Sequence, residues 1–137
     1  MAKDAKARDA VLGTVRERLR PRESVVAVLP FASTPKRPAG PEGRIREGIY
    51  TSYRRYRPLV LTDRRLFVLD AGRNAHPRGV LAEFPLDDVA VVDVIRGRFH
   101  QNRVLLDLRG VGTVPFLVGG YEVDDLAKLQ TALERPG

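Results

Sequence analysis

The stretch from Pro58 to Asp70 constrains the fold of this chain more than any other part of the sequence. Two apolar runs rich in Leu and Val flank four polar residues, Thr62 to Arg65. Runs of this length, bounded by turn-forming residues, are typical of two adjacent antiparallel strands. Both runs are apolar throughout, so both faces of the predicted hairpin need cover. We therefore expect one core on one side of the hairpin and a further element on the other.

The chain beyond the hairpin predicts more short strands joined by turns. We expect four of them, at 80–84, 90–95, 104–108 and 114–118. The segment 85–89, which begins with proline and carries two acids, is typical of a single helical turn. Val104, Leu106 and Leu108 recur with period two, which indicates a half-buried strand. Because Pro115 has no backbone N–H, its strand is predicted to lie at a sheet edge or to turn the proline toward a free side.

Each end of the chain predicts a helix. Near the C-terminus one apolar stripe has helical spacing and consists of Val123, Leu126, Leu129 and Leu133. Near the N-terminus, residues 4–19 carry a narrower stripe of Val11, Leu12, Val15 and Leu19. Pro21 ends this helix, and a strand is expected over 24–29. The N-terminal helix could supply the second cover that the hairpin needs.

The segment from about 30 to 48 contains four prolines and three glycines, which predicts a long loop without regular structure. Loops of this length in a compact domain are often functional or disordered. The chain that follows mixes arginines with Tyr50, Tyr53 and Tyr56. Aromatic rings among arginines can stack on nucleic-acid bases. They can equally form an edge strand whose tyrosines lie on the core, and we favour this second interpretation because it needs no ligand.

Composition bounds the possible partners. The chain has 137 residues, no cysteine and a formal net charge of +7. It is the size of a single domain, it holds no apolar run of the roughly 20 residues that a membrane span needs, and it begins with no apolar leader. We expect a cytoplasmic protein. The basic excess at 36–65 could attract phospholipid, nucleic acid or an acidic protein, although an arginine-rich coding bias would produce the same composition.

The sequence offers little catalytic chemistry. His76 and His100 are far apart and have no cysteine or second histidine at metal-ligand spacing, so we expect neither a metal site nor a cofactor. Asp87 and Asp88 are adjacent at a predicted helix start, where carboxylates usually cap and face solvent. No catalytic residues are predicted, and we expect a protein that is not an enzyme.

Three short motifs nevertheless point to a family. Leu61-Thr62-Asp63-Arg64-Arg65-Leu66 is similar to the L-T-(D/N)-x-R-L hairpin of bacterial pleckstrin-homology-like (PH-like) and GRAM-like domains. Residues 85–89 resemble their P-L-D-D-V turn, and residues 19–25 resemble the L-x-P-x-E-x-V sequence before their first strand. The resemblance covers residues 19–134, although the Pro-rich insert departs from the compact family pattern.

The resemblance implies an α+β, PH-like fold. About seven antiparallel strands would form a bent sandwich or partly open barrel, capped by the C-terminal helix and preceded by the N-terminal one. We accordingly divide the chain into an N-terminal helix at 1–21 and a PH-like domain at 22–137, with its Pro/Gly-rich loop at about 30–48.

The resemblance also implies a non-catalytic binding module. The first hypothesis is protein association, including association of the chain with itself. The alternative is peripheral binding to anionic phospholipid at the inner face of the membrane, and non-specific nucleic-acid binding ranks third. The candidate anion- and lipid-binding residues are Lys36, Arg37, Arg44, Arg46, Arg54, Arg55 and Arg57. No small-molecule substrate is predicted.

Overall fold

A computed structural model describes residues 2–35, 49, 54–72, 74–97, 101–119 and 122–134 of the chain. Helix α1 (Ala2–Val15) continues into a short 3-10 helix (Arg16–Arg18), and α2 (Val123–Leu133) follows the last strand. Between them the strands are β1 (Val25–Leu29), β2 (Ser33–Thr34), β3 (Arg55–Tyr56), β4 (Leu59–Thr62), β5 (Arg65–Ala71), β6 (Pro77–Pro85), β7 (Val89–Arg96), β8 (Gln101–Leu108) and β9 (Gly112–Gly119).

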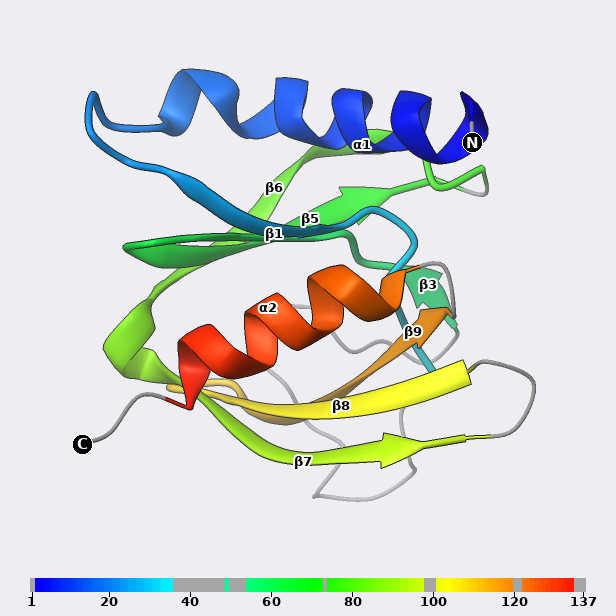
Figure 1. Cartoon of the computed structure of the whole chain (residues 1–137), viewed down its shortest axis with the longest axis vertical. Coiled ribbons are helices and arrows are strands. Elements are labelled where there is room, and N and C mark those ends of the chain that lie inside the picture. The colour runs from blue at the N-terminus through cyan, green and yellow to red at the C-terminus, as the bar shows by residue number, and fades with distance from the viewer. Residues whose placement is uncertain are drawn as a thin grey trace.

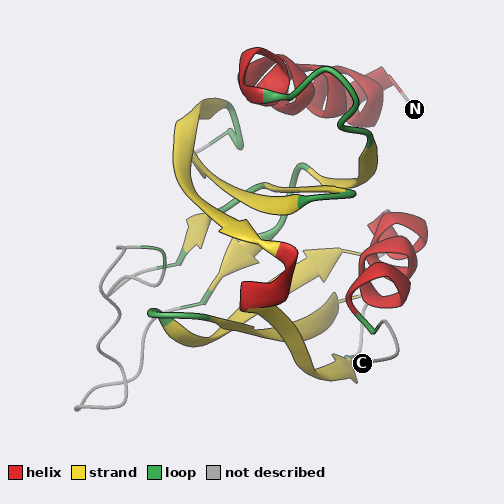
Figure 2. Ribbon diagram, turned by 90° about the vertical axis from the view of Figure 1, so that its left-hand side faces the viewer, coloured by secondary structure: helices red, strands yellow, loops and turns green. Residues whose placement is uncertain are grey.

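The strands form two antiparallel sheets that face each other. One has the order β1-β4-β5-β6 and the other the order β3-β2-β9-β8-β7. A 3-10 turn at Leu86–Asp88 carries the chain from β6 in the first sheet to β7 in the second. Helix α2 lies along the side where the sheets separate, and α1 lies over the outside of the first sheet (Figures 1 and 2). The predicted α+β class, with a helix at each end, is confirmed.

The β4–β5 hairpin is buried on both faces, as the sequence predicts. Leu61 pairs with Leu66 in register, and both side chains lie in the main core between the sheets. Val60 pairs with Phe67, and both point outward into a second cluster under α1. Helix α1 contributes two fully buried valines to this cluster, Val11 and Val15. The N-terminal helix is therefore the second cover of the hairpin.

An ion-pair network fixes the turn of this hairpin. Arg65 donates two hydrogen bonds to the Glu23 carboxylate, from Nε at 2.9 Å and from Nη2 at 2.8 Å. Thr62 donates its hydroxyl to the same carboxylate at 2.6 Å, and Arg65 also pairs with Glu83 of β6 at 2.7 Å. The Arg65 guanidinium lies 4.7 Å from the centre of the Phe67 ring, so one arginine joins the turn, the β1 approach, β6 and the second cluster.

Helix α2 protects the free edge of β1. Asp125 accepts a hydrogen bond from the backbone N–H of Val28 at 3.3 Å, and Glu122 accepts one from Phe31 at 3.1 Å. Asp125 also forms an ion pair with Arg8 of α1 at 2.9 Å. Asp125 therefore occupies a donor of the β1 edge that a strand of another molecule would otherwise use. Glu122, just before α2, holds the turn that follows β1, and the Arg8 contact ties the two helices together.

Two details differ from the sequence predictions, and a third decides between the two alternatives predicted for Pro115. Ser33–Thr34 forms strand β2 inside the segment predicted to lack regular structure, because it pairs with both β3 and β9; residues 36–48 lie outside the described residues. The strand containing Pro115 is interior rather than an edge, but β2 pairs with it at Leu117, beyond the proline. Val123 is 39% exposed, so the buried stripe of α2 starts at Leu126.

The Glu23 network generates the first prediction. Replacing Glu23, whose side chain is 0% exposed, with glutamine should lower the free energy of unfolding by about 3 kcal/mol, because the replacement leaves Arg65 without its main counter-ion. Hydrogen bonds from Arg65 hold the pKa of Glu23 at about 2, below its ordinary 4.5, although burial acts in the opposite direction. As the pH falls, Glu23 is therefore protonated in the unfolded chain before it is protonated in the folded chain. The stabilisation from the Glu23 carboxylate is complete above about pH 4.5 and is lost as the pH approaches 2.

Denaturant unfolding of wild type and Glu23→Gln across this pH range measures both effects, and the difference between the two proteins should shrink as the pH falls. Asp88→Asn is the matched control, since Asp88 pairs at 3.4 Å with Arg109, whose side chain is 80% exposed. This control should cost less than about 1 kcal/mol. Equal losses of unfolding free energy in both variants would contradict a special stabilising role for Glu23.

The cover role of α1 generates the second prediction. Val15→Ala should destabilise the fold by about 2 kcal/mol, because it removes buried methyl groups from the second cluster. Gly13→Ala, on the exposed side of α1 where a Cβ meets nothing within 4 Å, should stabilise it by up to about 1 kcal/mol. Thermal unfolding of both variants tests this, and unchanged melting temperatures in both would show that α1 does not contribute to the folded unit.

Candidate anion-binding pocket

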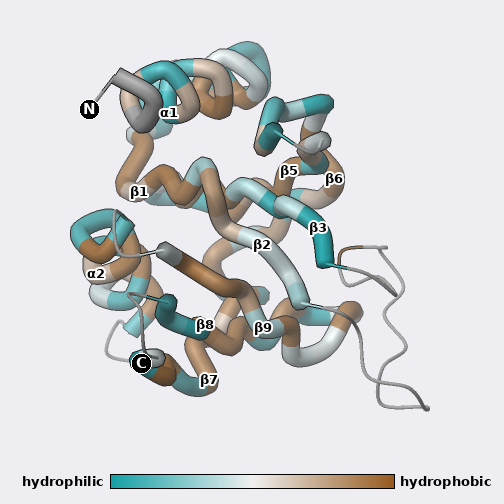
Figure 3. The backbone as a smooth tube through the Cα atoms, turned by 90° about the vertical axis from the view of Figure 1, so that its right-hand side faces the viewer, coloured by the Kyte–Doolittle hydropathy of each residue, from teal (hydrophilic) through white to brown (hydrophobic). Residues whose placement is uncertain are grey.

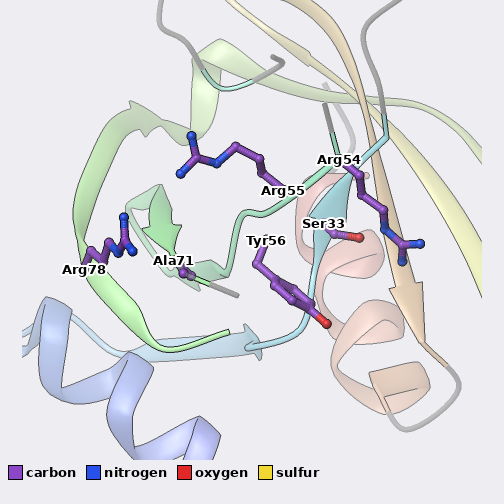
Figure 4. A pocket seen from close by; sticks show the side chains of 7 residues that line it. Ser33, Arg54, Arg55, Tyr56, Ala71 and Arg78 are labelled. Carbon is purple, nitrogen blue, oxygen red and sulfur yellow. The ribbon is translucent and has the colours of Figure 1, made fainter. Parts of the chain in front are cut away.

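A pocket of about 630 Å³ opens where the small strands β2 and β3 approach the end of the β5–β6 hairpin. Residues from β2, from β3 and from both strands of the β5–β6 hairpin therefore contribute to it (Figure 4). The residues that line it are Ser33, Arg54, Arg55, Tyr56, Ala71, Gly72 and Arg78. A cavity of this volume is in the range of small-molecule sites.

Two arginines from different segments reach into the same side of the pocket. Arg55 extends from β3 and Arg78 from the start of β6, and their guanidinium groups point toward each other (Figure 4). Arg54 and Tyr56 extend from the opposite side of the same strand, so Arg54 forms a separate part of the rim. Guanidinium groups are planar donors suited to phosphate and carboxylate oxygens, so the pocket has the chemistry of an anion site.

Gly72 provides the room for Arg78. A side chain at Gly72 would place its Cβ 3.2 Å from Nη2 of Arg78 and 3.4 Å from Nε. The 3.2 Å approach is tighter than most Cβ contacts, so a side chain at 72 would require the flexible end of Arg78 to shift by a few tenths of an ångström. The backbone pairing of β5 and β6, with Ala71 opposite Pro77, fixes this close approach.

A buried ion pair lies next to the pocket. Arg57 is 2% exposed, and its Nη1 atom is 2.6 Å from Oδ1 of Asp70. Its Nε atom donates to the carbonyl oxygen of Ile49 at 3.0 Å, and Nη1 also donates to Tyr56 O at 3.3 Å. Burial lowers the pKa of Arg57, and the facing carboxylate of Asp70 opposes that shift. The same Oδ1 atom of Asp70 lies 3.8 Å from Nη2 of Arg55, which belongs to the pocket.

The sequence candidates divide into three groups. Arg54 and Arg55 line the pocket. Arg57 points into the protein interior, which removes it from the cations that a ligand could reach. Lys36, Arg37, Arg44 and Arg46 lie outside the described residues, as do Tyr50 and Tyr53. Tyr56 belongs to an edge strand, as the favoured interpretation of the tyrosine segment predicts, but it is half-buried and lines the pocket, whereas that interpretation placed the tyrosines on the core.

Sequence reasoning missed Arg78 and Gly72, which lie between the predicted hairpin and the strand predicted at 80–84. The strand β6 begins at Pro77, three residues earlier than predicted, and this extension brings Arg78 back beside the end of β5. The available signal was the glycine close to the end of an apolar strand. A glycine in such a place often marks a close approach of other atoms to the backbone.

The other polar candidates do not gather into a site within the described part of the chain. His76 is exposed, and His100 lies outside the described residues. Asp88 is in the 3-10 turn, paired with Arg109. Among the described residues no group of three or more acidic, histidine or cysteine side chains is arranged to hold a metal ion. Their helices also include none that is long and apolar enough to cross a membrane.

Comparison with known protein families found no family model that matches this chain, and a search of curated proteins found no match either.

Proposed function

We propose that this chain is a non-catalytic, PH-like binding module that attaches to anionic phospholipid at the inner face of the membrane. The convergence of Arg55 and Arg78 on one pocket carries this proposal. Within the described residues, no carboxylate forms an ion pair with Arg78, so its charge is available to a ligand. Each basic residue close to an anionic membrane contributes about 1 kcal/mol, so Arg54, Arg55 and Arg78 together would supply about 3 kcal/mol.

The arrangement of the three sequence motifs supports the PH-like part of the proposal. Glu23, in the motif at residues 19–25, accepts hydrogen bonds from Thr62 and Arg65 of the hairpin motif at residues 61–66. The backbone N–H of Leu86, in the turn motif at residues 85–89, donates to the carbonyl oxygen of Arg64 in the hairpin motif at 3.2 Å. Motifs that are separated in sequence therefore meet at one corner, where each has a structural role. These contacts explain why the three motifs occur together in one chain.

Flotation with vesicles tests the lipid proposal. The chain should float with phosphatidylglycerol vesicles at low salt and not with phosphatidylcholine vesicles, and binding should weaken as salt is added. Arg55→Gln/Arg78→Gln should reduce binding by roughly tenfold or more, because it removes about 2 kcal/mol of attraction. Failure of the wild type to float with anionic vesicles at low salt would rule the proposal out.

Arg109→Gln is the matched control for charge. Arg109 is highly exposed and lies at the opposite end of the β8–β9 hairpin from the place where β2 pairs with β9. Its removal should change flotation much less than removal of a pocket arginine. An equal loss on replacing Arg109 would indicate a diffuse charge effect in place of a defined pocket.

Protein association is the second candidate, and one observation favours it. Val92 and Ile95 on the edge strand β7 are 56% and 47% exposed. The outer face of the hairpin, which a partner could otherwise cover, is covered within the chain by α1. Asp93 accepts a hydrogen bond from the N–H of Val94 at 2.8 Å, so one donor of the β7 edge is already occupied and association would use side chains. Nucleic-acid binding stays a prediction from charge.

Light scattering over a range of concentrations tests association of the chain with itself. We expect a concentration-dependent increase in mass that Ile95→Lys abolishes, because a charge would then be buried at the contact. The same substitution should leave the melting temperature nearly unchanged, since Ile95 is exposed. A strict monomer at high concentration would contradict this candidate.

A further inference from the structure

Asp70 is shared by two arginines that differ in how firmly they are held. Its Oδ1 atom lies 2.6 Å from Nη1 of Arg57 and 3.8 Å from Nη2 of Arg55. The first distance is a strong charge-assisted hydrogen bond, whereas the second is too long to be a hydrogen bond at all. Asp70 therefore forms a hydrogen-bonded ion pair with the interior Arg57, whereas it attracts Arg55 of the pocket only through its charge.

Arg57 is not free to leave Asp70. Its side chain is 3% exposed, and its guanidinium also donates to the carbonyl oxygens of Ile49 and Tyr56. Separating a buried pair of this kind leaves an uncompensated charge in the interior, which is strongly unfavourable. Asp70 is thus a fixed negative charge beside the pocket for as long as the chain is folded.

Arg55 can leave. Its side chain is 33% exposed, it lies on a two-residue edge strand, and among the described residues its guanidinium pairs with no carboxylate other than Asp70, at the long distance. A ligand that draws Arg55 toward itself must do so against the attraction of Asp70. The Asp70 carboxylate, itself 31% exposed, also repels the ligand directly. Both effects weaken anion binding, and the direct repulsion grows in proportion to the charge of the ligand.

We propose that Asp70 is a specificity-determining residue that restrains anion binding through Arg55 and reduces the preference that the pocket arginines would otherwise give to doubly charged phosphate monoesters over singly charged phosphodiesters. This inference rests on the proposed function, because it concerns the ligand of the same pocket. Phosphodiesters with one negative charge are the chemistry of the headgroup phosphates of phosphatidylglycerol. A phosphate monoester carries up to two charges at neutral pH and meets about twice the repulsion.

The variant that tests the proposal is Arg57→Gln/Asp70→Asn. It removes the carboxylate and its buried partner together, so the net charge is unchanged and no buried charge is left unpaired. Asn and Gln amides can still hydrogen bond to each other and to the Ile49 carbonyl. Asp88→Asn serves as the control, since it removes a carboxylate from the 3-10 turn between β6 and β7, which does not line the pocket.

Titration of backbone amide resonances with dimethyl phosphate and with inorganic phosphate gives the readout. We expect the double variant to bind dimethyl phosphate roughly threefold more tightly than wild type, and inorganic phosphate roughly tenfold more tightly, because the gain scales with ligand charge. Equal gains for the two anions, or no gain, would overturn the proposal while leaving the lipid function intact. Failure of the wild type to bind either anion would overturn both.

A measurement on the wild type covers the case in which the double variant does not fold. Saturating dimethyl phosphate should shift the Nε resonance of Arg55 and the carboxyl resonance of Asp70, and should leave the Nε resonance of Arg57 in place. A shift at Arg57 without one at Arg55 would overturn the proposal. Comparing the free anions with phosphatidylglycerol and phosphatidic acid vesicles of equal surface charge distinguishes the two sources of the phosphate. Flotation assigns the pocket to lipid headgroups, whereas binding of dimethyl phosphate without flotation on either kind of vesicle would assign it to a free phosphate and overturn the lipid function.

Discussion

The fold depends on one constraint, which is that the β4–β5 hairpin is apolar on both faces and both must be removed from water. Its inner residues join the core between the sheets, and its outer residues, Val60 and Phe67, need α1 above them. Burying a large aliphatic or aromatic side chain contributes roughly 1.5–3 kcal/mol, so neither face can be left exposed in a domain of this size. This requirement places α1, the hairpin and the second sheet in successive layers (Figure 3).

Polar contacts then fix how these layers are joined. Arg65 ties the hairpin turn to the β1 approach and to β6, and Asp125 ties the edge of β1 to both helices. The same logic applies next to the pocket, where the buried Arg57–Asp70 pair connects the start of β4 to the end of β5. The pocket is therefore built on rigid pairing, and its Arg55 is the exception, because a two-residue edge strand holds it. A rigid surround with one loosely held cation suits a binding site, since the ligand can compete for that cation without unfolding its neighbours.

Sequence patterns predicted most of the elements and few of the contacts of the site. The hairpin, the alternating strand with Leu106 and the buried part of α2 follow from local periodicity, which reports burial directly. Strand β2 was missed because two residues carry no period. Of the two alternatives for Pro115, the edge strand is wrong and the free side agrees with the structure, because the short strand β2 pairs with β9 at Leu117, beyond the proline. Arg57 was predicted to face a ligand and lies inside, because its carboxylate partner Asp70 is 13 residues away and meets it only through strand pairing.

By itself, the sequence determined the class of the fold, the two-sided burial of the hairpin and the helical cover, because these depend on the order of apolar and polar residues along the chain. It also determined that arginines would be concentrated between residues 36 and 65. Only the tertiary structure decided which of those arginines reach a pocket, because exposure and charge pairing depend on residues that are distant in sequence. Arg55 and Arg78 reach one pocket because the β5–β6 register places Arg78 beside the end of β5 and because β3, which carries Arg55, also lies against β5. Arg57, two residues away from Arg55, pairs instead with Asp70 in the interior.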